Sequence, residues 1–334
     1  MNKLENWRKQ LYVDVIPVLL SSQNEAIRYF VKRDLLQDKV PPVDSIWGLP
    51  GPLKIIGKQG SNGSWEYNGK KTTVYPPWHY SLLETFKRFR LLVERYQMNK
   101  EFTSVNKAAE YLFSCQTKEG DIRGMIGNQY ATYYTGFIIS LLIKAGYAQD
   151  SRVEKGMQWL LSMRQNDGGW TIPMLTHKLS RVTIYDLTTK YFEPLEPDRT
   201  KPFSHNWTNM VLQAFAAHPV YRSSKESQTA GDLLKSRFFK PDVYSSYKST
   251  GYWIRFQFWW PNLLTALQSL LLIGFSREDP QIRKAINWFI EHQENTGLWK
   301  LSYAEKVGVD THRNSEEEQW LGLAICRIIK YYFT

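Results

Sequence analysis

A helix-turn pattern that recurs along the chain is the feature that most constrains its fold. In VEKGMQWLLSMRQNDGGWTIP, residues 153–173, an amphipathic helix leads to a Gln and then to a Gly-Gly-Trp turn. VNKAAEYLFSCQTKEGDI and QIRKAINWFIEHQENTGLW repeat the pattern, with Gln116 and Gln293 in the same place. Such repeats predict one supersecondary unit per copy, each of which buries its apolar face against the next unit.

Two further copies are short or degenerate. PLKIIGKQGSNGSW carries Gln59 and Trp65, whereas the copy that starts at Gly231 and ends in KSTGYW keeps Trp253 but has no Gln in the usual place. Each copy precedes a longer and more apolar helical segment. These segments begin near Pro77, Gln129, Ser204, Phe256 and Ser315. The chain therefore predicts an outer helix, a turn and an inner helix, five times over.

Residues 3–38 add a sixth pair of helices. Asn24 and Glu25, before AIRYFVKRDLL, are helix start signals. The pattern of residues 1–48 also resembles a HEAT-type helix pair. Six pairs can close into a ring, which leaves no end helix exposed. We predict an all-α fold, an (α/α)6 toroid that forms one domain over residues 1–334.

The composition excludes several classes of protein. The net charge of +11 is scattered, with no long basic run, so we predict no nucleic-acid partner. Solvated helix faces explain most of this charge, and attraction to an anionic ligand or a membrane surface is the alternative. Two cysteines exclude a disulfide framework. The apolar stretch near the N-terminus is broken by Asp14 and Pro17, and no run of about twenty apolar residues exists, so we expect a cytoplasmic protein.

The repeated string of Lys, small residue, aromatic residue, Gln and Gly-x-Trp resembles the QW repeat. That repeat occurs in squalene and oxidosqualene cyclases and in protein prenyltransferase β subunits, which build (α/α)6 toroids. The resemblance covers residues 50–334, and the chain looks like bacterial proteins of a single toroid. It implies that Gln and Trp tie an outer helix to the next inner helix, with the Gln bonded to free amides at a helix N-terminus. The structural repeat residues would be Gln59, Trp65, Gln116, Gln165, Trp170, Trp253, Gln293 and Trp299.

Loop lengths indicate where a site lies. Inner-to-outer connections are short, whereas the outer-to-inner connections 66–76, 171–203 and 300–313 are long. All the long loops are therefore expected on one face of the ring. The same face should collect the N-termini of the inner helices, whose dipoles favour anions. Residues 171–203 are predicted to be a lid loop over this face.

Aromatic residues recur where the inner helices start, in a chain with 15% aromatic residues. Facing a cavity, such rings stabilise a cationic intermediate or enclose an apolar ligand. Packing against neighbouring helices is the alternative for each of them. The predicted substrate-binding residues are Trp78, His79, Tyr130, Tyr133, Tyr134, His205, Trp207, Phe256, Trp259, Trp260 and Trp320.

The chemistry of the family carries over only where its residues exist. The Asp-x-Asp-Asp acid motif and the Asp-Asp-x-x-Asp box are absent. Cys115 and Cys326 fall on helices and do not form a prenyltransferase zinc set, so we expect no metal and no cofactor. The candidate catalytic acids are Asp186, Asp310 and Glu317. A turn or cap role for Asp186, and helix-dipole complementarity for Glu317, are the alternatives.

Functions from different classes remain. The first is a terpene-cyclase-like toroid with an aromatic-lined cavity for an isoprenoid or other hydrophobic substrate, and with cyclase, isomerase or lyase chemistry if it is an enzyme. The second is a non-catalytic toroid that binds a hydrophobic ligand or a partner protein. A third is a carbohydrate-active α/α toroid, in which Trp and Tyr stack on sugar rings. The expected partner is a hydrophobic small molecule, peripheral membrane contact is left open, and the oligomeric state is not predicted.

Overall fold

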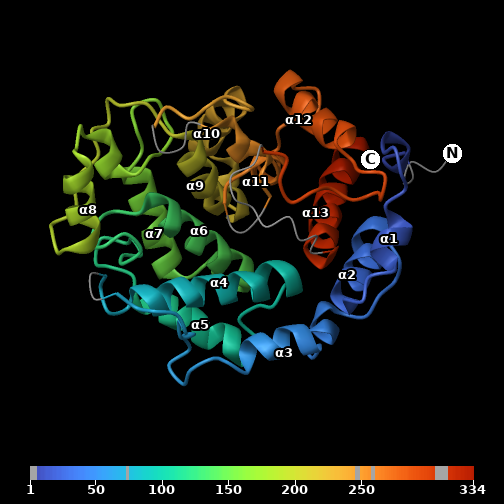
Figure 1. Ribbon diagram of the computed structural model, residues 1–334, viewed down its shortest axis with the longest axis horizontal. Helices are drawn as coiled ribbons and strands as arrows, with labels where there is room; N and C mark the ends of the chain where they lie inside the picture. Colours follow the sequence, from blue (N-terminus) through green and yellow to red (C-terminus); the bar gives the residue numbers. More distant parts are fainter. Residues whose placement is uncertain (1–5, 73–74, 245–248, 257–259, 305–314) are drawn as a thin grey trace.

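The computed structural model describes residues 6–72, 75–244, 249–256, 260–304 and 315–334. Within this part of the chain, helices follow one another around a ring, and the two chain ends lie near each other (Figure 1). The outer helices are α1 (Ile16–Leu20), α3 (Pro50–Ile56), α5 (Thr103–Ser114), α7 (Ser151–Ser162), α10 (Lys225–Ser236) and α12 (Pro280–Glu291). The inner helices are α2 (Glu25–Phe30), α4 (His79–Tyr96), α6 (Thr132–Leu142), α9 (His205–Ala217), α11 (Leu263–Ile273) and α13 (Ser315–Phe333).

These elements form the predicted all-α toroid of six helix pairs. The described residues contain no strand, and their β-type pairing is limited to isolated bridges. Two π-helical turns, η3 (Val31–Leu36) and η5 (Ile143–Tyr147), extend α2 and α6. Among the described helices, none is both long enough and apolar enough to cross a membrane.

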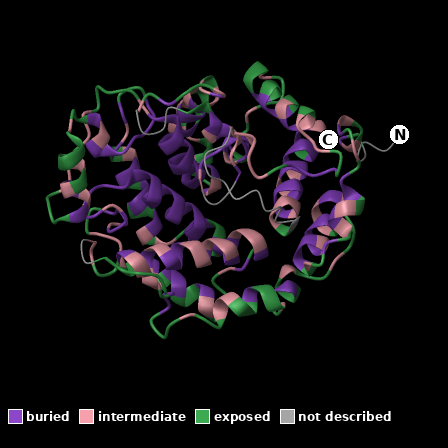
Figure 2. Cartoon of the chain, viewed as in Figure 1, coloured by how far each residue is buried: buried purple, intermediate pink, exposed green. Residues whose placement is uncertain are grey.

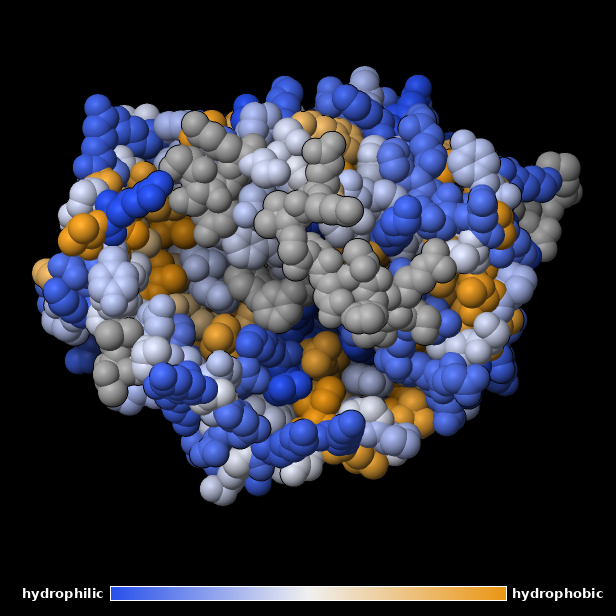
Figure 3. All heavy atoms as spheres, viewed as in Figure 1, coloured by the Kyte–Doolittle hydropathy of each residue, from blue (hydrophilic) through white to orange (hydrophobic). Residues whose placement is uncertain are grey.

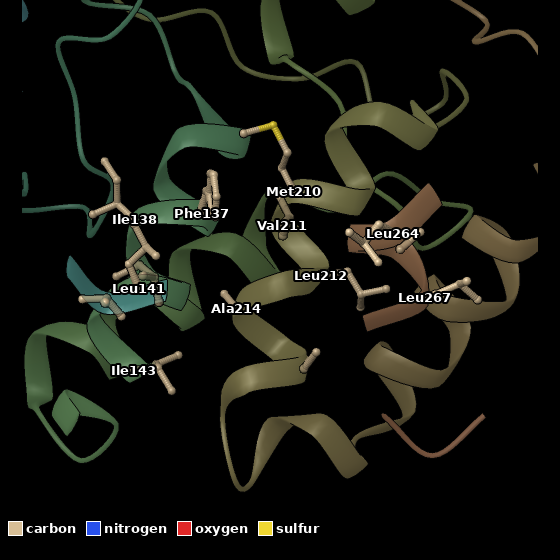
Figure 4. Close-up of a cluster of buried hydrophobic side chains, with 14 of the residues drawn as sticks. Phe137, Ile138, Leu141, Ile143, Met210, Val211, Leu212, Ala214, Leu264 and Leu267 are labelled. Carbon is tan, nitrogen blue, oxygen red and sulfur yellow. The ribbon is translucent and has the colours of Figure 1, made fainter. Parts of the chain in front are cut away.

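The inner helices α6 and α9 form the centre of the core. All residues of α6, and α9 from its start to Ala216, are buried, whereas the outer helices bury one face (Figure 2). Gly136 lies so close to α9 that a Cβ there would be 2.6 Å from the Cα of Val211. Apolar side chains of α6, α9 and α11 fill the space between these helices (Figure 4). The missing side chain of Gly136 therefore lets the backbones of α6 and α9 approach closely.

The ring closes where α13 packs against the N-terminal pair. Asn24 Nδ2, at the start of α2, donates to Glu316 Oε1 at 3.0 Å. Arg327 and Arg33 both pair with Asp34, and Lys330 Nζ donates to the carbonyl oxygen of Asp34 at 2.7 Å. A lysine that bonds carbonyls at the end of a helix also complements the helix dipole. Residues far apart in the sequence therefore join the two ends of the ring.

The repeat turns join neighbouring outer helices. Gln116 Nε2 donates to the carbonyl oxygens of Gly120 and Arg152, both at 2.8 Å, and Arg152 lies in the first turn of α7. Gln59 bonds Gly63 and Ser104 in the same way, and Gln293 bonds Gly297 and Val13, which precedes α1. The expected bond from Gln to amides at the start of an inner helix is therefore replaced by bonds to carbonyls of the next outer helix. Gln293 also accepts the Val13 N–H at 3.1 Å.

In the Trp170 turn, the indole N–H bonds the preceding outer helix and the backbone N–H bonds the next inner helix. Trp170 Nε1 donates to the Leu160 carbonyl at 2.7 Å, and Trp299 Nε1 donates to the Phe289 carbonyl at 2.7 Å. The backbone N–H of Trp170 donates to Thr208 Oγ1, on α9, at 2.8 Å. Trp65 and Ile122 bond Thr85 and Thr135 of their inner helices in the same way, and Trp253 Nε1 bonds the Lys240 carbonyl. These buried threonines make the link to the inner helix.

Three expected features differ in the structure. The segment 171–203 is not a plain loop, because Ser180 caps a helix, α8 (Arg181–Thr189), that lies at the outer margin of the ring (Figure 1). The fifth inner helix begins at Leu263 and not near Phe256, because Asn262 forms a capping box with Thr265.

The inner helices also do not all start on the same face of the ring, because the start of α13 lies beside the end of α4. The last turn of α4 meets the first turns of α13, where Arg95 pairs with Glu317 and Tyr96 packs 6.3 Å from Trp320. The ring contact of Tyr96 and the ion pair of Arg95 hold the end of α4 beside the start of α13.

Candidate functional site

Aromatic side chains from neighbouring inner helices form a continuous series of ring contacts, which we call the aromatic row. Its members are Phe86, Tyr134, Tyr133, Trp207 and Trp260, in order of contact. Successive ring centroids are 5.7, 4.4, 4.5 and 5.5 Å apart. The row crosses from α4 through α6 and α9 to the segment before α11. Four of its five rings are buried, and only Trp260 is half-buried.

The row arises from the close packing of α4, α6 and α9. Phe86 contacts both Tyr134 and Phe137 edge-on, and Tyr133 tilts onto Trp207. Offset and edge-to-face arrangements of this kind are the favourable ones for aromatic rings. Sequence reasoning brought out four members but missed Phe86, because that residue lies two turns into α4 and not at the helix start. Helical spacing from His79, at i and i+7, could have found it.

The two predicted histidines, His79 and His205, connect the starts of α4 and α9 to neighbouring turns. His79 Nδ1 contacts the Gly124 carbonyl oxygen at 2.9 Å, its ring stacks on Tyr75, and burial lowers the pKa of this imidazole. His205 stacks on Trp253 at 4.5 Å. Its Nδ1 lies 3.4 Å from a carboxylate oxygen of Asp242, and burial lowers the pKa of His205 to about 4. Each histidine therefore contacts the turn of the next repeat.

Asp242 is a buried acid that sequence reasoning missed. Its carboxylate accepts hydrogen bonds from Ser204 Oγ at 2.8 Å and from the backbone N–H groups of Asn206 and Tyr244 at 3.2 and 3.1 Å. Ser204 and Asn206 belong to the start of α9, so the carboxylate fixes this helix start. Ser204 lies 38 residues before Asp242 in the sequence, so no local sequence pattern predicts this hydrogen bond.

The other predicted substrate-binding residues pack outside the aromatic row. Phe256 contacts Phe289 of α12 at 5.5 Å, and Trp320 contacts Phe30 at 6.3 Å where the ring closes. Tyr130 donates to Glu119 at 2.7 Å and lies 3.2 Å from Glu196, which ties the 119–130 segment to the end of the 171–203 segment. Trp259 lies outside the described residues.

The predicted acids are not brought together. Asp186 lies on α8 and pairs with Lys190 at 2.9 Å, whereas Glu317 lies at the start of α13 and pairs with Arg95. The two helices stand on opposite sides of the ring (Figure 1). Asp310 lies outside the described residues. The catalytic role of these acids stays a prediction.

One open groove lies among the outer-to-inner connections, and we call it the Trp78 groove. Its volume is about 290 Å³. It is lined by Tyr75, Pro76, Pro77, Trp78, Gly127, Asn128, Thr189, Lys190 and Tyr191. Gly127 has a φ of +64°, and a Cβ there would lie 2.8 Å from the Thr188 carbonyl oxygen, so glycine lets the two walls meet. Figure 3 shows exposed hydrophobic residues on the side of the molecule where α8 lies.

Known proteins share parts of this architecture. Residues 86–178 match the family model of the squalene-hopene cyclase C-terminal domain, a range that contains Phe86, Tyr133 and Tyr134. This match confirms the resemblance to squalene cyclases predicted from the repeat turns.

Solved structures resemble the chain at low identity. A protein from Actinoplanes has 15% identity and a TM-score of 0.45, over 96% of this chain and 88% of that one. A type II terpene cyclase from Scytonema has 12% identity and a TM-score of 0.43, over 99% and 98% of the two chains. A structure of that cyclase with its substrate geranylgeranyl dihydroxybenzoate has 10% identity and a TM-score of 0.35, over 99% and 98%.

Proposed function

We propose that this squalene-cyclase-like toroid binds an isoprenoid or a similar hydrophobic small molecule. The aromatic row is the observation that carries the proposal. The hydrocarbon chain of an isoprenoid offers only C–H and alkene groups, so it binds by contact with apolar, polarizable surface. Three of the five rings of the row lie in the range that matches the squalene-hopene cyclase domain.

Binding without chemistry is the function that the described acids favour. Asp186 and Glu317 are each held in an ion pair, on opposite sides of the ring. Protonation of an isolated alkene needs a strong and well-supported acid, and the chain lacks the Asp-x-Asp-Asp motif. The Asp242 carboxylate already accepts hydrogen bonds from Ser204, Asn206 and Tyr244.

Cyclase, isomerase or lyase chemistry on a polyprenyl-like substrate is the second candidate. The family match and the aromatic row favour it, because aromatic faces stabilise a developing cation. A lid role for residues 171–203, a peripheral membrane contact and a cytoplasmic location are further parts of this proposal. The lid role rests on loop length, and the membrane contact rests on net charge.

Calorimetric titration with farnesol and geranylgeraniol tests the binding proposal. Tyr133→Leu and Trp207→Leu should weaken binding at least about tenfold, which corresponds to about 1.4 kcal/mol. Tyr185→Ala is the control, because this tyrosine is exposed on α8, outside the row. Thermal melts check that each variant is folded. A wild-type protein that binds neither alcohol would contradict the proposal.

Mass spectrometry of the incubated substrates separates binding from chemistry. A polyprenyl panel should be recovered unchanged if the protein only binds. A cyclised or rearranged product would favour the second candidate. In that case Asp186→Asn and Glu317→Gln show whether either predicted acid is needed.

A further inference from the structure

The Trp78 groove exposes more aromatic surface than the aromatic row does. Trp78 is 47% exposed and Tyr191 is 76% exposed, whereas Trp207 of the row is 1% exposed. The two exposed rings line the groove from different segments, one before α4 and one after α8. Exposed aromatic pairs that line one concave surface are typical of ligand sites.

Trp78 is fixed in place before any ligand binds. Its Nε1 donates to the Arg123 carbonyl oxygen at 3.4 Å. A Cβ added to Gly124 would lie 2.1 Å from that same nitrogen, so the indole rests directly on the backbone of the glycine. A ring held in this way loses little conformational entropy when a ligand covers it.

The polar side chains of the groove already have partners. Asn128 Nδ2 donates to the Phe192 carbonyl at 3.0 Å, and Thr189 Oγ1 donates to the Tyr185 carbonyl at 2.7 Å. Lys190 pairs with Asp186 at 2.9 Å, and the Tyr191 hydroxyl donates to Glu193 at 3.0 Å. A polar ligand such as a sugar or a nucleotide would compete with these bonds for the same side chains. A hydrocarbon needs none of them.

We propose that the Trp78 groove is a binding subsite for one end of an isoprenoid hydrocarbon chain. This inference rests on the proposed function and extends it to a second site at the edge of the ring. The volume of about 290 Å³ lies at the lower limit of about 300–1,000 Å³ for complete ligand pockets, so the groove holds part of a long chain. A chain in the groove bridges the start of α4 and the end of α8, and so holds the 171–203 segment against the ring.

Equilibrium dialysis with radiolabelled farnesol and geranylgeraniol, both kept below their aggregation limits, tests this subsite. Trp78→Ala and Tyr191→Ala should each weaken geranylgeraniol binding at least about tenfold, or about 1.4 kcal/mol. Farnesol, which is shorter, should lose less. Tyr185→Ala is the matched control, because it removes an exposed ring of α8 that does not line the groove. Hydrogen exchange should slow at residues 188–191 when geranylgeraniol binds to the wild type.

The outcomes separate the two proposals. Wild-type binding in Trp78→Ala and Tyr191→Ala, with weak binding in Tyr133→Leu, would overturn the subsite and leave the proposed function standing. Absence of binding in the wild type would overturn both. A ligand-free dimer in sedimentation velocity that Trp78→Ala dissolves would assign the groove to a second copy of the chain, and would also overturn the subsite.

Discussion

The turns after α5 and after α10 occupy equivalent places in the ring but are built differently. After α5, Gln116 follows the C-cap Cys115 and bonds the first turn of α7. After α10, Phe238 follows the C-cap Arg237 and packs 5.3 Å from Trp253. A phenyl ring cannot donate to carbonyls, so Phe238 makes no such bond, and the described link from α10 to α12 is the ion pair of Lys235 with Asp279.

The positive-φ residue of each turn differs as well. Gly120 has a φ of +118°, and a Cβ there would lie 2.6 Å from the Lys155 carbonyl oxygen. At the α10 turn this conformation belongs to Phe239, with a φ of 60°, whose ring centroid lies 5.4 Å from Lys284 Nζ. Beside it, a groove of about 480 Å³ opens towards α12.

The parts that recur in the turns have different roles. Trp253 of the α10 turn and Trp299 of the Gln turn after α12 are buried and bond carbonyls of their own repeat, whereas the turn after α5 has Ile122 in this place. The Gln turns after α3, α5 and α12 add a carboxamide bond to the backbone at the start of the next outer helix.

Removing the tryptophan should have the largest effect at either kind of turn. Trp299→Ala and Trp253→Ala should each lower the free energy of unfolding by about 3–5 kcal/mol, because each deletes a fully buried indole and its hydrogen bond. Urea denaturation measures this loss. Trp78→Ala, at a half-exposed position, is the control and should cost much less. A loss below about 1 kcal/mol in Trp299→Ala would contradict the fastening role.

Removing the carboxamide should have the next largest effect, and only where it exists. Gln116→Ala leaves the carbonyl oxygens of Gly120 and Arg152 without their donor, at a cost of about 1–3 kcal/mol. Gln165→Ala should instead loosen the 171–203 segment, since Gln165 Nε2 bonds the carbonyls of Asp198 and Lys201. Urea denaturation and hydrogen exchange at residues 196–203 distinguish these effects. Gln158→Ala, on the exposed face of α7, is the control.

Acid should weaken the Phe238 turn through His205, which stacks on Trp253. Burial lowers the pKa of His205 to about 4, against about 6.5 in the unfolded chain. The unfolded state therefore binds a proton first as the pH falls. Stability from the neutral imidazole is complete above pH 6.5 and declines between about 6.5 and 4, by about 1–3 kcal/mol in total.

Unfolding free energies measured between pH 7.5 and 4.5 check this dependence. His205→Gln should flatten the curve over that range. His79→Gln, at the start of α4, should flatten it as well, because burial also lowers the pKa of His79. An unchanged slope in both variants would contradict the assignment of acid sensitivity to these imidazoles.

The ring of helix pairs was predictable because its signals are local. Helical periodicity, a Gln near the helix end and a Gly-x-Trp turn can all be read within about twenty residues. The bonds of Gln116 were not predictable, because one acceptor lies 36 residues ahead and is a backbone carbonyl. Every residue has a backbone carbonyl, so the residue type does not show which carbonyl accepts the bond.

The aromatic residues of the candidate site show a similar limit. His205 and Trp207 stand two residues apart at the start of α9, yet one stacks on Trp253 and the other contacts Tyr133 and Trp260. The sequence placed both at the helix start and predicted one cavity for both. Which neighbour covers each face of an inner helix depends on the ring, and only the packed structure decides it.

Exchanging the positive-φ residues should give the smallest net effect at the Phe238 turn. Phe239→Gly removes the cost of a left-handed aromatic residue, about 1–2 kcal/mol, but it also removes the contacts of the ring with Lys284 and Trp288. These terms oppose each other, so the free energy of unfolding should change by less than about 1 kcal/mol. Gly120→Ala has no such compensation, because the new Cβ meets the Lys155 carbonyl. A loss in Phe239→Gly as large as that in Gly120→Ala would show that the ring is as firm a link to α12 as the glycine contact is to α7.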